Sequence, residues 1–228
     1  MTPTLYLFCN ESYGSPYMAI ARRFAKQYRI KVIVIFSGKY ILLEKVGDGF
    51  LAQARAFARK RIQEQRLKNT YHLPIRIISD INSPFFFEQV RSCDYGVISG
   101  FNQIFKTQTI DRFGLIVNFH PSILPLYRGP VPSIWCVRNE EEKTGFTLHK
   151  VTERIDEGEI LYQEEIVIRG INDPDMIDLL ISERGALLFW KYLSHLFLQV
   201  PWEIARVDAY HTYRHHVRYA SFPRNVSV

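Results

Sequence analysis

Short apolar runs alternate with longer amphipathic stretches over the first half of the chain. The runs Leu5 to Cys9 and Lys31 to Phe36 are typical of buried strands, whereas Tyr17 to Tyr28 and Phe50 to Lys68 have helical spacing. The alternation continues through the segments Arg76 to Ser79, Pro84 to Ser92, Tyr95 to Ser99 and Leu115 to Phe119. Strands that alternate with helices pair in parallel. We therefore predict an α/β fold with a Rossmann-like, open, mainly parallel sheet flanked by helices.

The second half contains two alternating runs and one long helix. Thr144 to Val151 and Ile160 to Ile168 are predicted strands on either side of a turn that contains Asp156. Asp173 is the expected N-cap of a helix that runs through Leu196, with a proline at its first position. We predict a single domain over residues 1–200 and a short C-terminal hairpin or tail over 201–228.

Composition places the chain among folded, non-membrane proteins. Of 228 residues, 47% are hydrophobic, which is enough for a sizeable core. No apolar stretch of membrane-spanning length occurs and the N-terminus lacks a signal peptide, so we expect a cytoplasmic protein. Three widely spaced cysteines, Cys9, Cys93 and Cys136, predict reduced thiols and no metal site.

The charge pattern distinguishes few functions. The net charge of +6 suits an anionic ligand such as a folate, a phosphate or a nucleic acid, but it is also common on ordinary enzymes. The tail from Tyr210 to Tyr219 interleaves aromatic and cationic residues. It fits a nucleic-acid patch, a nucleotide-stacking surface or a structural strand, of which we favour the last.

Polar side chains follow the strand Leu115 to Phe119 directly. Asn118 and His120 lie at its carboxyl end, where open α/β sheets bind ligands. Ser122 follows His120 too closely to form a Ser-His pair, so covalent catalysis does not fit. An amide and an imidazole can stabilise an oxyanion while the more distant Asp156 manages a proton. These residues favour direct acyl transfer between two bound substrates.

Each of the three residues also has a simpler explanation. An asparagine after a strand is often a turn former, and a lone histidine is more often structural than catalytic. Asp156 could be a turn residue, with Gly158 supplying a positive φ. Taken singly, the residues leave hydrolysis, group transfer and a structural role open.

In order and spacing, a longer set of residues resembles the folate-dependent formyltransferase family. The set comprises Asn118 to Pro125, Tyr127 to Gly129, Pro132, Trp135, Thr144 to His149 and Ile155 to Gly158. The resemblance covers roughly residues 87–189 well. It implies transfer of a formyl group from 10-formyltetrahydrofolate to a primary amine, with Asn118, His120 and Asp156 as the catalytic residues. It implies no metal.

The resemblance also implies a folate-binding loop after the strand Tyr95 to Ser99. The residues assigned to the co-substrate are Gly100, Phe101, Gln103, Ile104, Phe105 and Ile155. Two positions depart from the family pattern, because Asn102 replaces a glycine and Lys106 replaces a proline. Asparagine tolerates left-handed backbone angles, so we expect the loop to keep its shape. The alternative is an apolar loop that only caps the sheet.

The acceptor is the least constrained part of the prediction. Tyr127, Arg128, Gly129 and Pro130 resemble a loop of methionyl-tRNA and sugar-amine formyltransferases that glycinamide ribonucleotide formyltransferases lack. The tRNA enzymes carry a further C-terminal barrel domain, and only about thirty residues follow the last predicted helix here. We therefore predict a nucleotide-linked amino sugar as the small-molecule acceptor, with nucleic acid and membrane partners disfavoured.

Two further positions and several rival functions complete the expectations. Asn10 and Ser12 follow the first strand and are candidates for acceptor contact, although a helix-capping turn explains them equally well. Glycinamide ribonucleotide and methionyl-tRNA remain alternative acceptors. A non-catalytic folate-binding protein and an RNA-binding module are alternatives of another class. The family resemblance also raises a homodimer as a possible assembly.

Overall fold

The computed structural model describes residues 3–38 and 50–201 and contains one seven-stranded sheet. The strand order is β3-β2-β1-β4-β5-β6-β7. The first five of these strands are parallel, whereas β6 and β7 pair antiparallel. The predicted open, mainly parallel sheet is therefore confirmed. The strands are β1 (Thr4–Cys9), β2 (Lys31–Ser37), β3 (Ile75–Ile78), β4 (Tyr95–Ser99), β5 (Leu115–His120), β6 (Lys143–Lys150) and β7 (Ile160–Val167).

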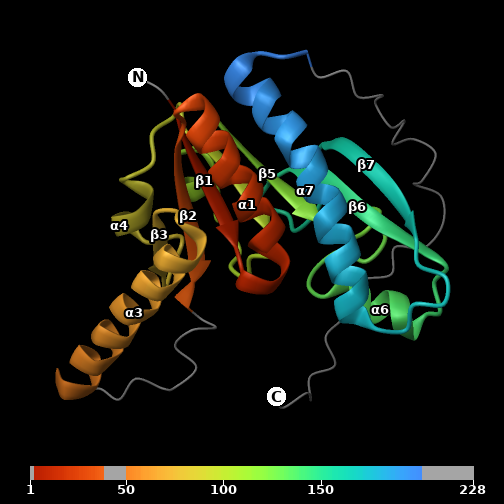
Figure 1. Ribbon diagram of the computed structural model, residues 1–228, viewed down its shortest axis with the longest axis horizontal. Coiled ribbons are helices and arrows are strands. Elements are labelled where there is room, and N and C mark those ends of the chain that lie inside the picture. The colour runs from red at the N-terminus through yellow and green to blue at the C-terminus, as the bar shows by residue number, and fades with distance from the viewer. Residues whose placement is uncertain (1–2, 39–49, 202–228) are drawn as a thin grey trace.

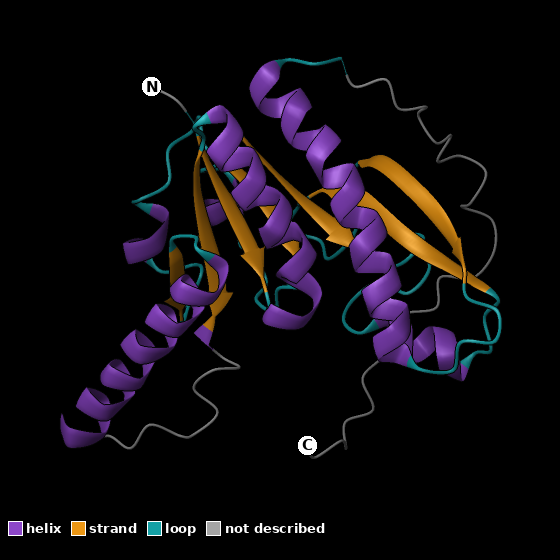
Figure 2. Cartoon of the chain, in the orientation of Figure 1, coloured by secondary structure: helices purple, strands orange, loops and turns teal. Residues whose placement is uncertain are grey.

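Two long helices cover one face of the sheet, and a third extends away from it (Figure 1). The helices α1 and α7 lie side by side across the strands, as the cartoon in Figure 2 also shows. No helix in the described part of the chain is long and apolar enough to cross a membrane. The helices are α1 (Glu11–Tyr28), α3 (Phe50–Tyr71), α4 (Pro84–Phe87), α5 (Thr107–Ile110), α6 (Pro132–Arg138) and α7 (Pro174–Leu198).

The side chains of the central strands point alternately to the two faces of the sheet, and each face has its own hydrophobic core. Side chains such as Leu7 and Phe119 face α1 and α7 and belong to the larger core. Their neighbours, such as Phe8 and Ile116, face the opposite way and pack with Phe86 in a smaller core. Because successive side chains of a strand point to opposite faces, a continuous apolar run serves a sheet buried on both sides. Both cores hold the carboxyl ends of the strands in a fixed place.

The largest differences between the predicted and the observed helices occur at three places. The helix α1 begins at Glu11 rather than Tyr17, because the side chain of Asn10 accepts a hydrogen bond of 2.7 Å from the backbone N–H of Tyr13. The segment predicted from Pro84 to Ser92 is helical only to Phe87, and the short helix α5 was not predicted. The predicted C-terminal hairpin or tail lies outside the described residues, apart from residue 201.

Candidate active site

Strand pairing brings the first two polar residues of the site together. Asn118 of β5 lies directly opposite His149 of β6 in the antiparallel ladder. Side chains of directly opposed residues share one face of the sheet, and so do residues two apart on one strand. The side chains of Asn118, His149 and His120 are therefore on the same face. This places an amide and two imidazoles at the carboxyl end of β5.

The carboxylate arrives from the turn after β6. Asp156 has a left-handed backbone with φ of 53°, a conformation that aspartate tolerates better than most residues. A Cβ atom at Gly158 would lie 1.8 Å from the carbonyl oxygen of Lys150, so only glycine fits there. The glycine lets the turn fold back tightly against β6. This close return directs the Asp156 carboxylate toward the end of β5.

Asp156 is the centre of a four-residue cluster. Its Oδ1 accepts a hydrogen bond of 3.3 Å from Nδ2 of Asn118 and lies 3.5 Å from Nε2 of His149. Its Oδ2 lies 3.5 Å from Nδ1 of His120. The side chains of His120, His149 and Asp156 are 4%, 2% and 10% exposed, so the cluster is shielded from bulk water.

Backbone carbonyls fix both imidazole rings. Nε2 of His120 donates to the carbonyl oxygen of Tyr127 at 2.9 Å, and Nδ1 of His149 donates to that of Lys150 at 2.8 Å. The second nitrogen of His149 is then free to accept from Nδ2 of Asn118 at 3.2 Å. The remaining nitrogen of His120 faces the carboxylate. The hydrogen bonds thus aim each ring nitrogen at a defined partner.

The surroundings move the pKa of Asp156 against the effect of its burial, whereas the pKa of His120 moves with the effect of its burial. Burial alone raises the pKa of the Asp156 carboxyl, but the two histidines and the N–H of Gly129 outweigh it and hold that pKa well below its usual range. For His120, burial lowers the pKa and outweighs the opposing attraction of Asp156. Near neutral pH the cluster therefore combines an ionised carboxylate with a neutral imidazole.

This combination can carry out proton transfer and oxyanion stabilisation in one place. A neutral imidazole can accept a proton, and the adjacent carboxylate stabilises the imidazolium that results. The amide hydrogens of Asn118 point at His149 and Asp156. The side-chain amide of Asn118 has two N–H groups, so a hydrogen bond to a developing oxyanion would replace one of these two hydrogen bonds. Neither Ser122 nor Cys136 competes as a nucleophile, because each hydroxyl or thiol is directed to another partner, Leu126 and Thr144 respectively.

Comparison with known proteins identifies the segment that carries this cluster. Residues 88–181, which contain all four of its members, match the family model described as formyl transferase. This part of the chain is similar to the formyltransferase family. The segment includes β4 to β7 and the beginning of α7, so the residues that match the family model include the whole cluster.

The most similar sequences include several methionyl-tRNA formyltransferases. A methionyl-tRNA formyltransferase from Syntrophus aciditrophicus is 37% identical over 125 residues, which cover 54% of this chain and 40% of that protein. The chain thus spans less than half the length of this relative.

Solved structures share the fold at low sequence identity. Glycinamide ribonucleotide transformylase 1 from Symbiobacterium toebii has a TM-score of 0.60 at 15% identity, covering 83% of this chain and 85% of that one. An N-formyltransferase from Helicobacter canadensis, solved with folinic acid and dTDP-3-aminofucose, has a TM-score of 0.61 at 20% identity, covering 87% and 65%. These likenesses show the formyltransferase fold.

The loop after β5 joins the cluster through its backbone. The N–H of Gly129 donates to Oδ2 of Asp156 at 2.8 Å, and Nη1 of Arg128 donates to Glu157 at 2.8 Å. Arg128 thus fixes the loop through a carboxylate. The ring of Tyr127 is buried and its hydroxyl bonds to Glu141, while Pro130 is exposed. Contact between this loop and an acceptor remains a prediction.

Buried side chains shape the predicted folate loop of the formyltransferase segment. The carboxamide of Gln103 accepts from the N–H of Ile81 and donates to Ser37 and Ile78, while Phe105 packs against Phe8 at 5.0 Å between ring centroids. The positive φ of 71° falls at Gly100 and not at Asn102, so the tolerance of asparagine for left-handed angles is not needed. The side chains left accessible are half-buried Phe101 and the exposed Ile104 and Ile155.

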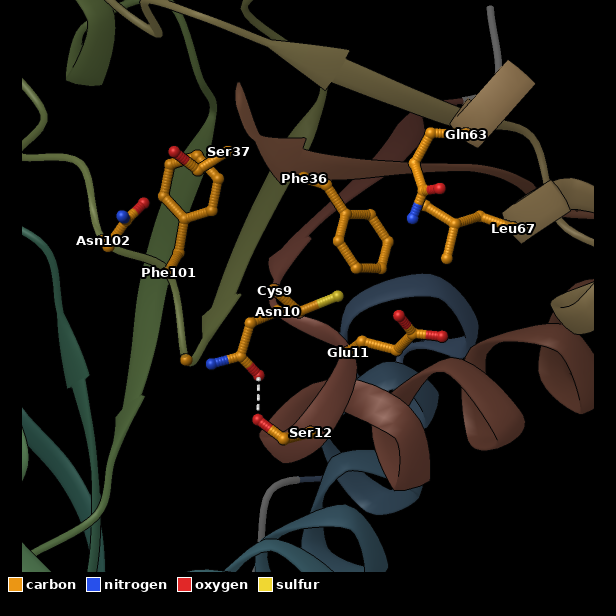
Figure 3. A pocket seen from close by; sticks show the side chains of 11 residues that line it. Cys9, Asn10, Glu11, Ser12, Phe36, Ser37, Gln63, Leu67, Phe101 and Asn102 are labelled. Atoms are coloured by element: carbon orange, nitrogen blue, oxygen red, sulfur yellow. Dashed lines mark hydrogen bonds between the residues drawn. The ribbon is translucent and has the colours of Figure 1, made fainter. Parts of the chain in front are cut away.

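A pocket lies next to the N-terminal candidates of the formyltransferase fold. Asn10 and Ser12 line it with Gly100, and its volume is about 400 Å³ (Figure 3). Asn10 also caps α1, so the helix-capping explanation is correct for this residue, although its amide nitrogen makes no hydrogen bond among the described residues. A capping role and a place in a binding pocket are compatible.

Sequence reasoning did not assign a role to His149. The residue stands within the family motif, but its function depends on lying opposite Asn118. A register shift in the pairing of β6 with β7 occurs between Leu148 and His149, where the strand bends. The sequence shows a histidine at the end of a predicted strand with alternating apolar and polar residues. It does not show which strand pairs with this one, so the contact with Asn118 could not be predicted. The N–H of Gly129 was missed for the same reason.

Activity is expected to fall on acidification before any global unfolding. The lowered pKa of His120 keeps the imidazole neutral at pH 7, the form that can accept a proton. As the pH falls through this pKa, below the usual 6.5 of histidine, the ring becomes protonated and kcat/KM for formyl transfer should decline. Rates measured from pH 5 to 8, with circular dichroism at each pH as control, test this. A kcat/KM that rises as the pH falls would contradict it.

Proposed function

We propose that this protein transfers a formyl group from 10-formyltetrahydrofolate to the primary amine of an amino sugar that is attached to a nucleotide. The observation that carries the proposal is the buried cluster of Asn118, His120 and Asp156, which holds amide donors, a neutral imidazole and a carboxylate with no nucleophile beside them. Direct transfer between two bound substrates needs these groups and no covalent enzyme intermediate.

The residues have separate tasks in such a reaction. The amine nitrogen forms a bond to the formyl carbon, and the bond from that carbon to the folate nitrogen breaks. Asn118 donates a hydrogen bond to the formyl oxygen as it gains negative charge. His120 takes the proton that the amine loses, and Asp156 stabilises the charged ring. The departing folate nitrogen takes up one proton as its bond to carbon breaks, so that it leaves as a neutral amine and His120 returns to its neutral form. The N–H of Gly129 holds the carboxylate in position throughout.

Two loops offer suitable contacts for the folate. Ile104 is 62% exposed and Ile155 is 51% exposed, although both lie in short loops that follow strands of the sheet. Exposed apolar side chains near a polar cluster are typical of a site for a flat organic ring. The Helicobacter canadensis neighbour was solved with folinic acid, a formyl-folate. These observations support a formyl-folate as the donor.

The choice of acceptor is supported by fewer observations. The residues Tyr127 to Pro130 resemble the corresponding loop of sugar-amine and methionyl-tRNA formyltransferases. Methionyl-tRNA is the second candidate, because the 37% identical relative bears that name. Glycinamide ribonucleotide is the third, on the basis of fold likeness.

A direct assay separates these acceptors. We expect the protein with 10-formyltetrahydrofolate to add one formyl group to a nucleotide-linked amino sugar, detected as a mass gain, at a higher kcat/KM than for glycinamide ribonucleotide or methionyl-tRNA. The matched control is the Asn118→Ala variant, which lacks the oxyanion donor. If methionyl-tRNA alone were formylated, the acceptor would be methionyl-tRNA and not an amino sugar. No product with any of the amines would overturn formyl transfer.

A further inference from the structure

The backbone carbonyl of Tyr127 determines which nitrogen of the neutral His120 ring carries the hydrogen. Nε2 of His120 lies 2.9 Å from this carbonyl oxygen, which can only accept a hydrogen bond, so Nε2 is the protonated nitrogen. The other nitrogen, Nδ1, is then unprotonated and lies 3.5 Å from Oδ2 of Asp156. Nδ1 is therefore the basic atom of the ring, and a proton that it accepts comes to lie beside the carboxylate.

Two neighbours of the ring favour opposite tautomers. The carboxylate of Asp156 favours a hydrogen on Nδ1, whereas the carbonyl of Tyr127 favours one on Nε2. With the hydrogen on Nδ1, the lone pair of Nε2 would face the carbonyl oxygen in a buried site, where water does not replace the lost hydrogen bond. The balance between the two tautomers thus depends on where the Tyr127 carbonyl is held.

The backbone of Tyr127 has a conformation that needs support. Its φ of 55° lies in the left-handed region, which is disfavoured for residues with a Cβ atom. Oγ of Ser122 donates to the carbonyl oxygen of Leu126 at 2.6 Å, and the N–H of Gly129 donates to Asp156 at 2.8 Å. Such a backbone persists only while its surroundings hold it in place. Loss of a support is therefore expected to move the carbonyl.

The side chain of Tyr127 provides a further support, at the end of the ring that is remote from His120. Its ring is 6% exposed, and its hydroxyl donates to the carboxylate of Glu141 and accepts from Nδ2 of Asn139 at 2.9 Å. Burial and the hydrogen bond to Glu141 raise the pKa of the Tyr127 hydroxyl to about 12, so it remains a donor at neutral pH. These bonds attach Tyr127 to the connection between α6 and β6.

We propose that Tyr127 is a positioning residue for formyl transfer: its hydroxyl, held by Glu141 and Asn139, keeps its carbonyl on Nε2 of His120 and so makes Nδ1 the atom that takes the amine proton. In that step an N–H bond of the amine breaks as the Nδ1–H bond forms, and Asp156 balances the charge of the ring. The identity of the proton donor rests on the proposed function, whereas the tautomer is a property of the free protein.

NMR of the full chain labelled with ¹⁵N in its histidines reads the tautomer directly. Long-range correlations distinguish a protonated Nε2 from a protonated Nδ1, and the His120 signals are assigned from their loss in His120→Gln. We expect the Nε2–H form in the unaltered protein. In Tyr127→Phe, which removes only the hydroxyl, the Nδ1–H form should become detectable. The value of kcat should fall about tenfold, with KM for both substrates within about twofold.

A second tyrosine that bonds to a glutamate provides the matched control. The hydroxyl of Tyr162 on β7 donates to Glu164 at 3.2 Å, so Tyr162→Phe removes a similar hydrogen bond and should change neither the tautomer nor kcat. Glu141→Ala tests the same support if Tyr127→Phe does not fold. Glu141→Gln should retain the original tautomer and turnover, because a carboxamide oxygen can still accept from the Tyr127 hydroxyl.

The outcomes distinguish a positioning role from a structural one. An Nδ1–H form in the unaltered protein, or a tautomer that is the same in Tyr127→Phe and Glu141→Ala, overturns the proposal. A loss of stability in Tyr127→Phe with unchanged kcat for the folded protein also overturns it. The NMR measurement requires no turnover, so a tautomer that depends on Tyr127 supports the role of its carbonyl even if no amine is formylated. Formyl transfer with an insensitive tautomer overturns this proposal alone.

Discussion

Replacing Asp156 by asparagine is expected to lower kcat for formyl transfer by about a hundred- to a thousandfold. The variant keeps the size of the side chain but removes the negative charge that faces His120 across 3.5 Å. A protonated His120 would then have no counter-charge in a buried site, so taking up the amine proton becomes unfavourable. Folate affinity should change little, because the carboxylate acts on the reacting groups. Single-turnover rates and folate titration measure the two effects separately.

A second aspartate provides the matched control for this prediction. Asp175 lies in the first turn of α7, exposed and away from the cluster, so Asp175→Asn should leave kcat within about twofold. If Asp156→Asn retained full turnover, the carboxylate would be a turn residue and the proposed chemistry would be wrong. A parallel loss of kcat and of folate affinity would instead indicate that the whole loop had moved. Circular dichroism of both variants excludes unfolding as the cause.

Replacing Phe119 by alanine is expected to lower the free energy of unfolding by about 3–5 kcal/mol. The side chain is fully buried, with ring centroids 5.1 Å from Tyr17 and 5.9 Å from Phe189. Its removal leaves a cavity between β5 and the helices α1 and α7, which the surrounding rings can fill only in part. Urea denaturation followed by fluorescence gives the change directly.

An exposed phenylalanine serves as the control for the cavity. Phe57 of α3 is 60% exposed, so Phe57→Ala should change the free energy of unfolding by about 0.5 kcal/mol or less. Because Phe119 stands between Asn118 and His120, its loss should also reduce turnover in the protein that remains folded. Equal stability of the two variants would mean that the core beneath β5 does not hold the site.

The sequence predicts the sheet better than it predicts the ends of the helices. Buried parallel strands produce continuous apolar runs, which is why β1, β2 and β4 were predicted to within one residue. The start of α1 was missed because Pro16 argued against a helix that begins before it. The side chain of Asn10 caps that earlier start, and a hydrogen bond of this kind is local but ambiguous in sequence.

The sequence predicts those residues of the site that belong to a motif of fixed spacing. It does not predict those that reach the site through the pairing of strands. Asn118, His120 and Asp156 were assigned from the family motif, and the structure brings them into contact. His149 and the N–H of Gly129 complete the cluster through contacts between β5, β6 and two loops. Such contacts are set by strand register and by the return of the turn at Gly158, which a single sequence does not specify.

The cluster and the pocket are built from different parts of the chain. The members of the cluster all lie in residues 88–181, whereas most of the pocket lining comes from residues 9–12, 36–37 and α3. Substitutions in the N-terminal stretch can therefore reshape the pocket without moving the residues of the cluster. A chimaera that exchanges the N-terminal half with that of a related chain would therefore alter the pocket and leave the cluster of Asn118, His120, His149 and Asp156 in place.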